Sequence, residues 1–473
     1  MNKLRINKFY QGIIFLCLTI GASTYARNNN LVRKNVKIDS VISQDAPDIQ
    51  DVQIDEQVNR GLFGGSCGGC GTCACCLKNI QTIKKVPTTI STSGVYCLNE
   101  NLFATSCDQI SALVTISSSD VMINLNGFTL TGGRRGIQIN PNLQNIMIQN
   151  GAIINSDLEA VYVSPGVKIV QLTDLQIINA NQSKCGLGIG GVVFAGLDNN
   201  RISDSLIKNV AVTDTVGRGF SLEFTDNTKI VDSSALSILN TTNTSGMGFL
   251  IIGDNNLLEN NKAAHILTTV TNLSSYGFLI AGSVGTIIKN SQASFISTIA
   301  PAGDALGFSV EACGCTLLEH CVSQDNSALP AAAMPVTASN AVGFRSISST
   351  ETRFFDCVAC HNNSTAAGIG HGFVLGGTLL AQADLRDCIS ECVSLSNTGD
   401  GFRVFSTCAN CVTRFSKALA NTGFGFNLTA ASPTNIFYSN FAAQNVAGNY
   451  NNIANVNLLG AAVFAEGDNI NGV

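Results

Sequence analysis

The sequence is organised around a ladder of glycine–phenylalanine steps. Eight steps recur between residues 219 and 426, and successive glycines lie 29, 29, 30, 36, 29, 29 and 24 residues apart. The steps are Gly219-Phe220, Gly248-Phe249, Gly277-Phe278, Gly307-Phe308, Gly343-Phe344, Gly372-Phe373, Gly401-Phe402 and Gly425-Phe426. A repeat of this length is the signature of a solenoid, in which each repeat packs only on its neighbours. The sequence therefore predicts a rod of stacked coils.

Short alternating runs and turn residues fill the coils. Ile123 and Leu125 alternate with Asn124 and Asn126, which is the pattern of a strand with one buried face. Charged residues make up 12% of the chain, about half the usual share, while glycine reaches 45 residues. We predict an all-β solenoid of about twelve coils, with the phenylalanine of each step pointing inward and stacking on the next.

The early coils resemble a known family. The run SDVMINLNGFTLTGGRRGIQINPNLQNIMIQNGAIINS (119–156), preceded by TISTSGVYCLNENL (89–102), is similar to the opening coils of right-handed parallel β-helix proteins of the pectin-lyase-like superfamily. With the later glycine–phenylalanine steps, the resemblance covers about residues 88–473. It implies a single-stranded right-handed coil with three sheets. Enzymes, adhesins and structural spikes use this scaffold, so the fold alone names no function.

Three segments precede the predicted β-helix of residues 88–473. Residues 1–26 read as a signal peptide, because basic residues precede a short apolar run and small residues follow it. The apolar run is too short for a membrane span, so we expect export to the periplasm, the cell surface or the medium. Residues 27–60 read as an acidic disordered linker, and residues 61–87 as a Gly/Cys-rich tail. The net charge of −5, with no basic stripe, argues against nucleic acid.

Cysteines cluster in the tail and recur in the coils. The tail cysteines are Cys67, Cys70, Cys73, Cys75 and Cys76. In an exported chain we favour disulfides, within the tail or to another chain, over a metal clip, because zinc sites usually need a second, distant ligand pair. Cys97 and Cys107 are candidates for a local disulfide.

The late-coil cysteines predict a ladder. Cys321 and Cys357 each follow their glycine by 14 residues and Cys388 by 16, so we expect these three to stack on neighbouring coils as buried thiols or as disulfides. Read as strings, three late pairs resemble metal-binding pairs: Cys357-x-x-Cys360, Cys388-x3-Cys392 and Cys408-x-x-Cys411. With His320 beside Cys321 and His361 beside Cys360, they suggest a zinc or copper site. We favour the ladder and predict no metal and no cofactor.

One stretch resembles an enzyme motif locally. Gly370-His371-Gly372 matches part of the polygalacturonase-type pattern, a resemblance that implies paired carboxylates flanking the scissile bond. The Asp-Asp pair of that pattern is missing, and the Asn-Thr element at 397–398 follows the histidine motif instead of preceding it. Isolated acidic residues also argue against a calcium-dependent lyase. His371, Asp400 and Arg403 are catalytic candidates only under this alternative.

A binding face follows from the inward phenylalanines. The residue after each of them should point outward, which predicts one exposed face. Its candidate ligand-binding residues are Ser309, Arg345, Arg403 and Asn427. We predict an exported, non-catalytic binding or structural module whose partner is a polysaccharide or another surface protein. The alternatives are a polysaccharide lyase or polygalacturonase-like glycosidase, and a periplasmic metal-binding β-helix protein.

Overall fold

The computed structural model describes residues 80–104, 111–180, 190–241, 244–299, 302–329, 339–364, 369–376, 387–405, 408, 410–428, 435–451, 457–458 and 463–464. The chain divides into two compact units, Met1–Asn79 and Ile80–Val473, and every described residue belongs to the second. The predicted signal peptide, acidic linker and five tail cysteines therefore lie outside the described residues. Within the described ranges, no helix is long and apolar enough to cross a membrane.

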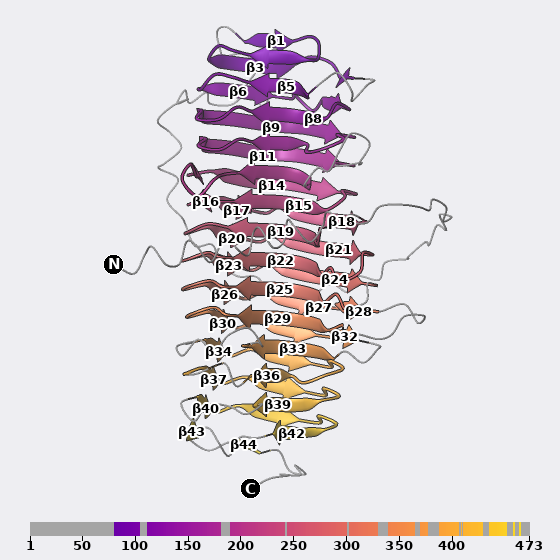
Figure 1. The fold of residues 1–473 in the computed structure, drawn as a ribbon, viewed down its shortest axis with the longest axis vertical. Coiled ribbons are helices and arrows are strands. Elements are labelled where there is room, and N and C mark those ends of the chain that lie inside the picture. Colours follow the sequence, from indigo (N-terminus) through magenta and orange to yellow (C-terminus); the bar gives the residue numbers. More distant parts are fainter. Residues whose placement is uncertain are drawn as a thin grey trace, which may run out of the picture. The chain divides into compact units, whose positions relative to one another are not determined.

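The second unit is a right-handed parallel β-helix, as the repeat and the family resemblance predicted. Its strands form two sheets in which each strand pairs with the equivalent strand of the next coil (Figure 1). The 14-stranded sheet contains one wall of the coil. Its strands are β2 (Thr88–Ile90), β5 (Ala112–Ile116), β8 (Arg135–Ile139), β10 (Val161–Val163), β12 (Gly190–Ala195), β15 (Arg218–Glu223), β19 (Gly246–Ile252), β22 (Ser275–Ala281), β25 (Ala305–Glu311), β29 (Ala341–Ile347), β33 (Gly370–Leu375), β36 (Phe402–Val404), β39 (Phe424–Leu428) and β42 (Gly448–Asn451).

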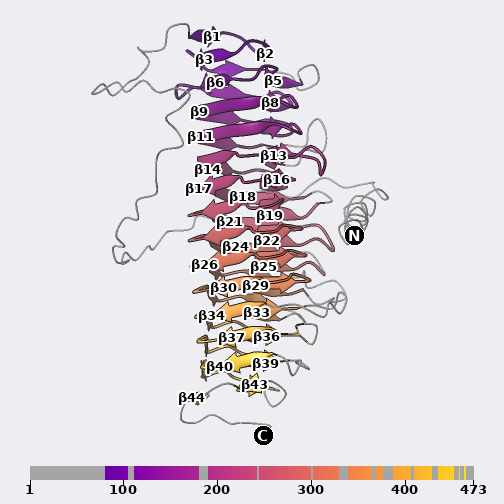
Figure 2. The same cartoon turned by 90° about the vertical axis from the view of Figure 1, so that its left-hand side faces the viewer.

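The 30-stranded sheet makes the other two walls, because the long strands β9 and β11 continue around the corner between them (Figure 2). Its strands are β1 (Gln81–Ile83), β3 (Gly94–Leu98), β4 (Leu102–Phe103), β6 (Val121–Asn124), β7 (Thr129–Thr131), β9 (Gln144–Ile154), β11 (Lys168–Ile178), β13 (Ile202–Ser203), β14 (Leu206–Thr213), β16 (Thr225–Asp226), β17 (Lys229–Val231), β18 (Ser234–Asn240), β20 (Leu257–Glu259), β21 (Lys262–Thr268), β23 (Ile287–Lys289), β24 (Gln292–Thr298), β26 (Leu317–Glu319), β27 (Val322–Gln324), β28 (Ser327–Ala328), β30 (Arg353–Phe355), β31 (Val358–Cys360), β32 (Asn363–Ser364), β34 (Cys388–Ser390), β35 (Val393–Leu395), β37 (Val412–Arg414), β38 (Lys417–Leu419), β40 (Ile436–Tyr438), β41 (Phe441–Ala443), β43 (Asn457–Leu458) and β44 (Val463–Phe464).

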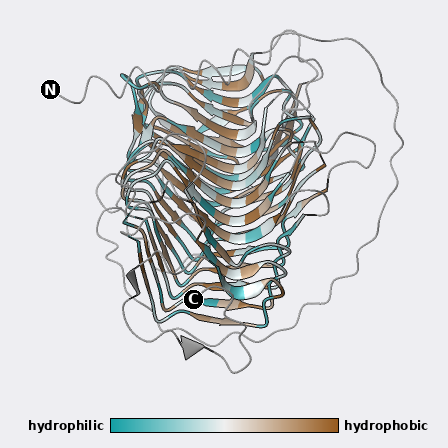
Figure 3. Cartoon of the chain, turned by 60° about the horizontal axis from the view of Figure 1, so that its bottom comes forward, coloured by the Kyte–Doolittle hydropathy of each residue, from teal (hydrophilic) through white to brown (hydrophobic). Residues whose placement is uncertain are grey.

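The glycine–phenylalanine steps build the core. Rings from Phe220 to Phe426 stack from coil to coil with centroids 4.7–4.9 Å apart. The glycine is needed for close approach of the opposite wall. A Cβ at Gly219 would lie 2.6 Å from the Cβ of Ala235 and 2.7 Å from the carbonyl oxygen of Gly248. Hydrophobic segments recur at corresponding places in successive coils (Figure 3). The predicted inward stacking is therefore confirmed.

Asparagines close the corners of the coils in two ways. At one corner, residues such as Asn209, Asp232 and Asn260 adopt positive φ, a conformation that Asn and Asp tolerate best among residues with a side chain. At another corner, four buried asparagine side chains and one half-buried one form a ladder in which each Nδ2 donates to Oδ1 of the next, at 2.7–2.9 Å. The ladder consists of Asn326, Asn362, Asn397, Asn421 and Asn445. The sequence pattern did not predict it.

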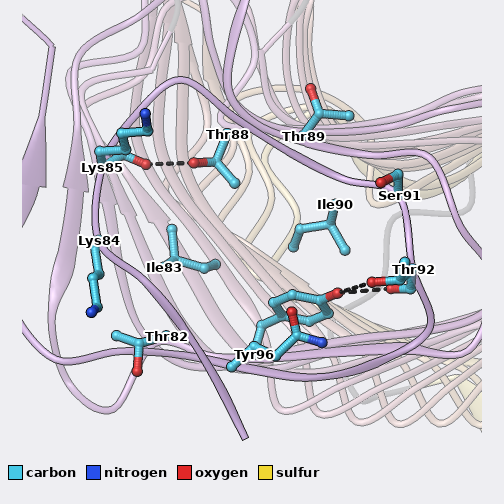
Figure 4. Close-up of a pocket in the computed structure, with 11 residues that line it drawn as sticks. Thr82, Ile83, Lys84, Lys85, Thr88, Thr89, Ile90, Ser91, Thr92 and Tyr96 are labelled. Carbon is cyan, nitrogen blue, oxygen red and sulfur yellow. Dashed lines mark hydrogen bonds between the residues drawn. The ribbon is translucent and has the colours of Figure 1, made fainter.

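The N-terminal end of the β-helix corrects one predicted boundary. β1 pairs in register with β3, so the β-helix begins at or before residue 81. The predicted start of the β-helix at residue 88 is therefore too late. A three-residue strand with one inward isoleucine is too short to show period-2 alternation. A cavity of about 500 Å³ lies in this first coil, with Ile83, Ile90 and Tyr96 around it and the Tyr96 hydroxyl bonded to Thr92 (Figure 4). It is the end of the core, and we assign it no function.

Candidate functional site on the outer face of the 14-stranded sheet

The parallel, in-register strands gather outward side chains into columns. Ser309 pairs with Arg345, Arg345 with Val374, Val374 with Arg403, and Arg403 with Asn427. The four predicted binding residues therefore occupy one column, and Arg345 and Arg403 lie two rungs apart, about 10 Å. A parallel column holds Tyr276, Leu306, Val342 and His371.

This face is less exposed than the sequence suggested. Ser309 is fully buried and Val374 is only 6% exposed. The side chain of Arg345 is 13% exposed. Tyr276 and Phe405 pack against Leu306, Val342 and Val374, because strands one rung apart bring neighbouring large side chains into contact. Arg345, Arg403 and Asn427 are half-buried, so these three side chains are the accessible part of the predicted face.

Arg345 is held in a neutralised network. Its guanidinium bonds Glu311 at 2.6 Å, Asp304 at 3.2 Å and the Ser309 hydroxyl at 3.1 Å. Burial raises the pKa of the neighbouring Tyr276 phenol, and the Glu311 carboxylate raises it further. Both carboxylates near Arg345 are committed to one guanidinium.

His371, Asp400 and Arg403 do come together. The Asp400 backbone N–H lies 3.1 Å from His371 Nδ1, and Arg403 Nη1 lies 3.1 Å from His371 Nε2. The Asp400 carboxylate is 3.8 Å from Nδ1 and instead accepts hydrogen bonds from the Phe424 N–H at 2.9 Å and from Asn427 Nδ2 at 2.8 Å. Burial lowers the pKa of His371 to about 4. The Asp400 carboxylate opposes this effect, and the Arg403 charge adds to it. His371 is therefore neutral at neutral pH.

Arg403 differs from the other arginines of this sheet. Arg135, Arg218 and Arg345 each form an ion pair with a glutamate. In the described part of the chain, no carboxylate lies within ion-pair distance of Arg403, and its buried Nε has no hydrogen-bond partner. Its guanidinium lies 4.7 Å from the ring centroid of Phe405. Arg403 is thus a half-buried cation whose charge no described acidic group balances.

The late-coil cysteines form a thiol column, with one correction. The column is Cys321, Cys357 and Cys392, linked by thiol contacts from rung to rung. Cys388 instead pairs with Arg353 and Val412 on the outer surface. Counting from the rung glycine misplaced it, because 12 residues separate β33 from β34, against five between the equivalent strands β29 and β30 of the preceding coil. Burial raises the pKa of the Cys321 and Cys357 thiols well above the usual value.

The structure also bears on the other cysteine predictions, those for the CxxC pair at 408 and 411 and for Cys97. Cys408 and Cys411 form a disulfide, so this CxxC pair is not a metal pair. Cys97, Cys321, Cys357 and Cys388 carry free thiols, and Cys107 lies outside the described residues. Within the ranges that the structure covers, no cluster of three or more His, Cys, Asp or Glu side chains could hold a metal ion.

Comparison with known proteins finds distant similarity to several solved structures. No protein-family model and no curated protein matches the sequence. Among solved structures, the A-module of the Azotobacter vinelandii mannuronan C-5 epimerase AlgE4 is 12% identical, with 74% of this chain and 87% of that chain covered and a TM-score of 0.33. The pectate lyase Pel9A is 14% identical, with 62% and 70% covered and a TM-score of 0.33.

A bacteriophage protein and a surface adhesin show similarly low sequence identity to this chain. The N-terminal fragment of the bacteriophage Phi29 gene product 12 is 12% identical, with 76% of this chain and 67% of that chain covered and a TM-score of 0.40. PfbA, a surface adhesin of Streptococcus pneumoniae, is 11% identical, with 77% and 82% covered and a TM-score of 0.28. TM-scores of 0.40 or less carry no argument about fold or function. The fold assignment rests on the strand pairing itself.

Proposed function

We propose that this chain is an exported β-helix module that binds a polysaccharide without changing it chemically. The binding surface is the outer face of the 14-stranded sheet around Arg403. The observation that carries the proposal is the unbalanced charge of Arg403, which distinguishes it from the three ion-paired arginines on the same face. Export rests on residues 1–26, which lie outside the described residues. An intact mass that begins at residue 27 in the exported fraction tests it.

The shape of the face suits a chain-like ligand. Outward side chains repeat at about 4.8 Å per rung along the rod, so an extended polymer can contact several rungs at once. Asn427 and Asn451 continue the Arg403 column for two further rungs and are joined by a 3.1 Å hydrogen bond between their amides. Amide groups of this kind bond to sugar hydroxyls as donors and acceptors.

The non-catalytic reading follows from how the polar groups are engaged. Glycoside hydrolysis uses two carboxyl groups that flank the scissile bond. Asp400 is the one carboxylate described beside His371, and both of its oxygens accept hydrogen bonds from the protein. Asp400 and His371 are both buried. We therefore infer binding without turnover.

A lyase-type enzyme is the second candidate. The observation that favours it is the contact between a neutral histidine and Arg403. A neutral imidazole can accept a proton, and a guanidinium can hold a carboxylate of the substrate. Product analysis separates this candidate from the binding module.

Isothermal titration calorimetry of the full chain against acidic and neutral oligosaccharides tests the proposal. We expect Arg403→Met to weaken binding about 10- to 100-fold, because hydrogen bonds to charged groups contribute about 1.5–3 kcal/mol. Arg353→Met, at an exposed position of β30 on the other sheet, is the matched control and should bind normally. Equal loss in both variants, or no binding of any oligosaccharide by the wild type, contradicts the proposal.

A further inference from the structure

The two ring nitrogens of His371 both face hydrogen-bond donors. Nδ1 faces the Asp400 N–H and Nε2 faces Arg403 Nη1, each at 3.1 Å. A neutral imidazole has one N–H and only one acceptor nitrogen. Only one of these two contacts can therefore be a hydrogen bond at any moment. Protonation relieves neither contact, because the imidazolium has no acceptor. Arg403 therefore competes with the Asp400 N–H for the single acceptor nitrogen of His371.

The other surroundings of Arg403 do not hold it more firmly. Its Nε is buried without a partner, and its guanidinium rests near the Phe405 ring. Asp400 does not compete for it, because that carboxylate is bound by the Phe424 N–H and the Asn427 amide. Arg345, two rungs away, is already neutralised by Glu311 and Asp304. A guanidinium in this situation gains most from a planar oxyanion, which can accept two parallel hydrogen bonds.

We propose that Arg403 is an oxyanion-binding residue, that His371 is its resting partner, and that a carboxylate or sulfate group of the ligand displaces His371. On binding, the Arg403 side chain turns so that its fork, including the Nε that is buried at rest, meets the anion. His371 then adopts the Nε2–H tautomer, in which Nδ1 accepts from the Asp400 N–H without competition. This inference rests on the proposed function, to which it adds the chemical class of the ligand group and the exchange of partners.

Nitrogen NMR of the histidine side chains tests the exchange directly. The full chain is labelled with ¹⁵N-histidine and titrated with a uronate oligosaccharide, a sulfated oligosaccharide and a neutral one. We expect one or both anionic ligands to move the two His371 ring nitrogens to the shifts of a single neutral tautomer. The signals of His265, His320 and His361 serve as internal controls and should stay in place, as should all four during titration with the neutral ligand.

Two variants complete the test. His371→Ala removes the resting acceptor, and we expect anion affinity to rise about two- to tenfold, the value of one lost hydrogen bond. His371→Gln supplies a carbonyl oxygen with two lone pairs, which can accept from Arg403 and from the Asp400 N–H together, so anion affinity should not rise above the wild-type value. If an anionic ligand binds through Arg403 but the His371 nitrogens do not move, the exchange is wrong and the proposed function stands. If no ligand binds, the proposed function fails, and the exchange fails with it.

Discussion

The carboxylate of Asp387 accepts a hydrogen bond from the backbone N–H of Thr352 at 2.9 Å. Asparagines fill the equivalent position in other coils: Asn256 accepts from the Thr228 N–H and Asn435 from the Cys411 N–H, both at 2.9 Å. Asp387 is thus an acid in a place built for an amide. It is 1% exposed, and burial raises its pKa from 3.8 to about 6.

This relationship predicts the pH dependence of stability. A carboxyl group with a raised folded pKa stabilises the protein fully below about pH 4, and that stability is lost as the pH rises through 6. The shift corresponds to about 3 kcal/mol. We therefore expect Asp387→Asn to remove this loss, so that its advantage over the wild type grows between pH 4 and 7 in urea unfolding. An advantage that does not depend on pH would contradict the pKa assignment.

His371 supplies the matched control, with the opposite sign. Its folded pKa is lowered from 6.5 to about 4, so its contribution is present above pH 6.5 and is lost as the pH falls through 4. His371→Gln should therefore lose stability relative to the wild type as the pH rises through this window, whereas Asp387→Asn should gain it.

The aromatic stack should dominate stability locally. Phe344→Ala removes a fully buried ring that stacks on Phe308 and Phe373, and we expect a loss of about 3–5 kcal/mol in the free energy of unfolding. Phe295 is 45% exposed and stacks on His265, so Phe295→Ala should cost less than about 1.5 kcal/mol. Equal losses of unfolding free energy for Phe344→Ala and Phe295→Ala in chemical denaturation would show that the buried stack does not dominate the stability of the core.

The asparagine ladder makes a separate prediction. Asn397 Oδ1 accepts from both the backbone N–H and the side-chain amide of Asn362, at 2.9 and 2.7 Å. Asn397→Ala leaves these two buried donors without that acceptor, and each orphaned group costs about 1–3 kcal/mol. Asn363→Ala, at the exposed neighbouring position, should change stability by about 0.5 kcal/mol or less. Comparable melting temperatures for the two variants would refute the importance of the ladder.

Thiol reactivity should follow surroundings as well as exposure. Cys315 is exposed, yet its thiol donates to the Glu351 carboxylate at 3.0 Å, and this bond raises its pKa. We expect Glu351→Gln to speed alkylation of Cys315 at pH 8, because more thiolate is present. Peptide-level mass spectrometry measures the alkylation of Cys315 separately from that of the other cysteines. Cys321, Cys357 and Cys392 serve as buried controls that should stay unlabelled until the protein unfolds, and an unchanged Cys315 rate would contradict the assignment.

Local repetition explains which features could be predicted from the sequence. The spacing of Gly343 and Gly372 was enough to place Phe344 against Phe373, and it also placed Arg345 two rungs from Arg403. The ladder position of Cys392 depended on the length of the preceding loop, so counting selected Cys388 instead. The contacts of Asp304 and Glu311 with Arg345, and the burial of Ser309, depend on side-chain packing across the face. A periodic pattern carries no information on that packing.

We propose that the Arg403 face binds a polysaccharide without altering it. The most direct measurement is mass spectrometry of an oligosaccharide after long incubation with a stoichiometric amount of the full chain, under conditions where calorimetry shows the ligand to be bound. We predict an unchanged mass, with no shorter, hydrated or unsaturated product. A product that forms with the wild type and disappears with His371→Ala or Asp400→Ala would contradict the claim and make this protein an enzyme.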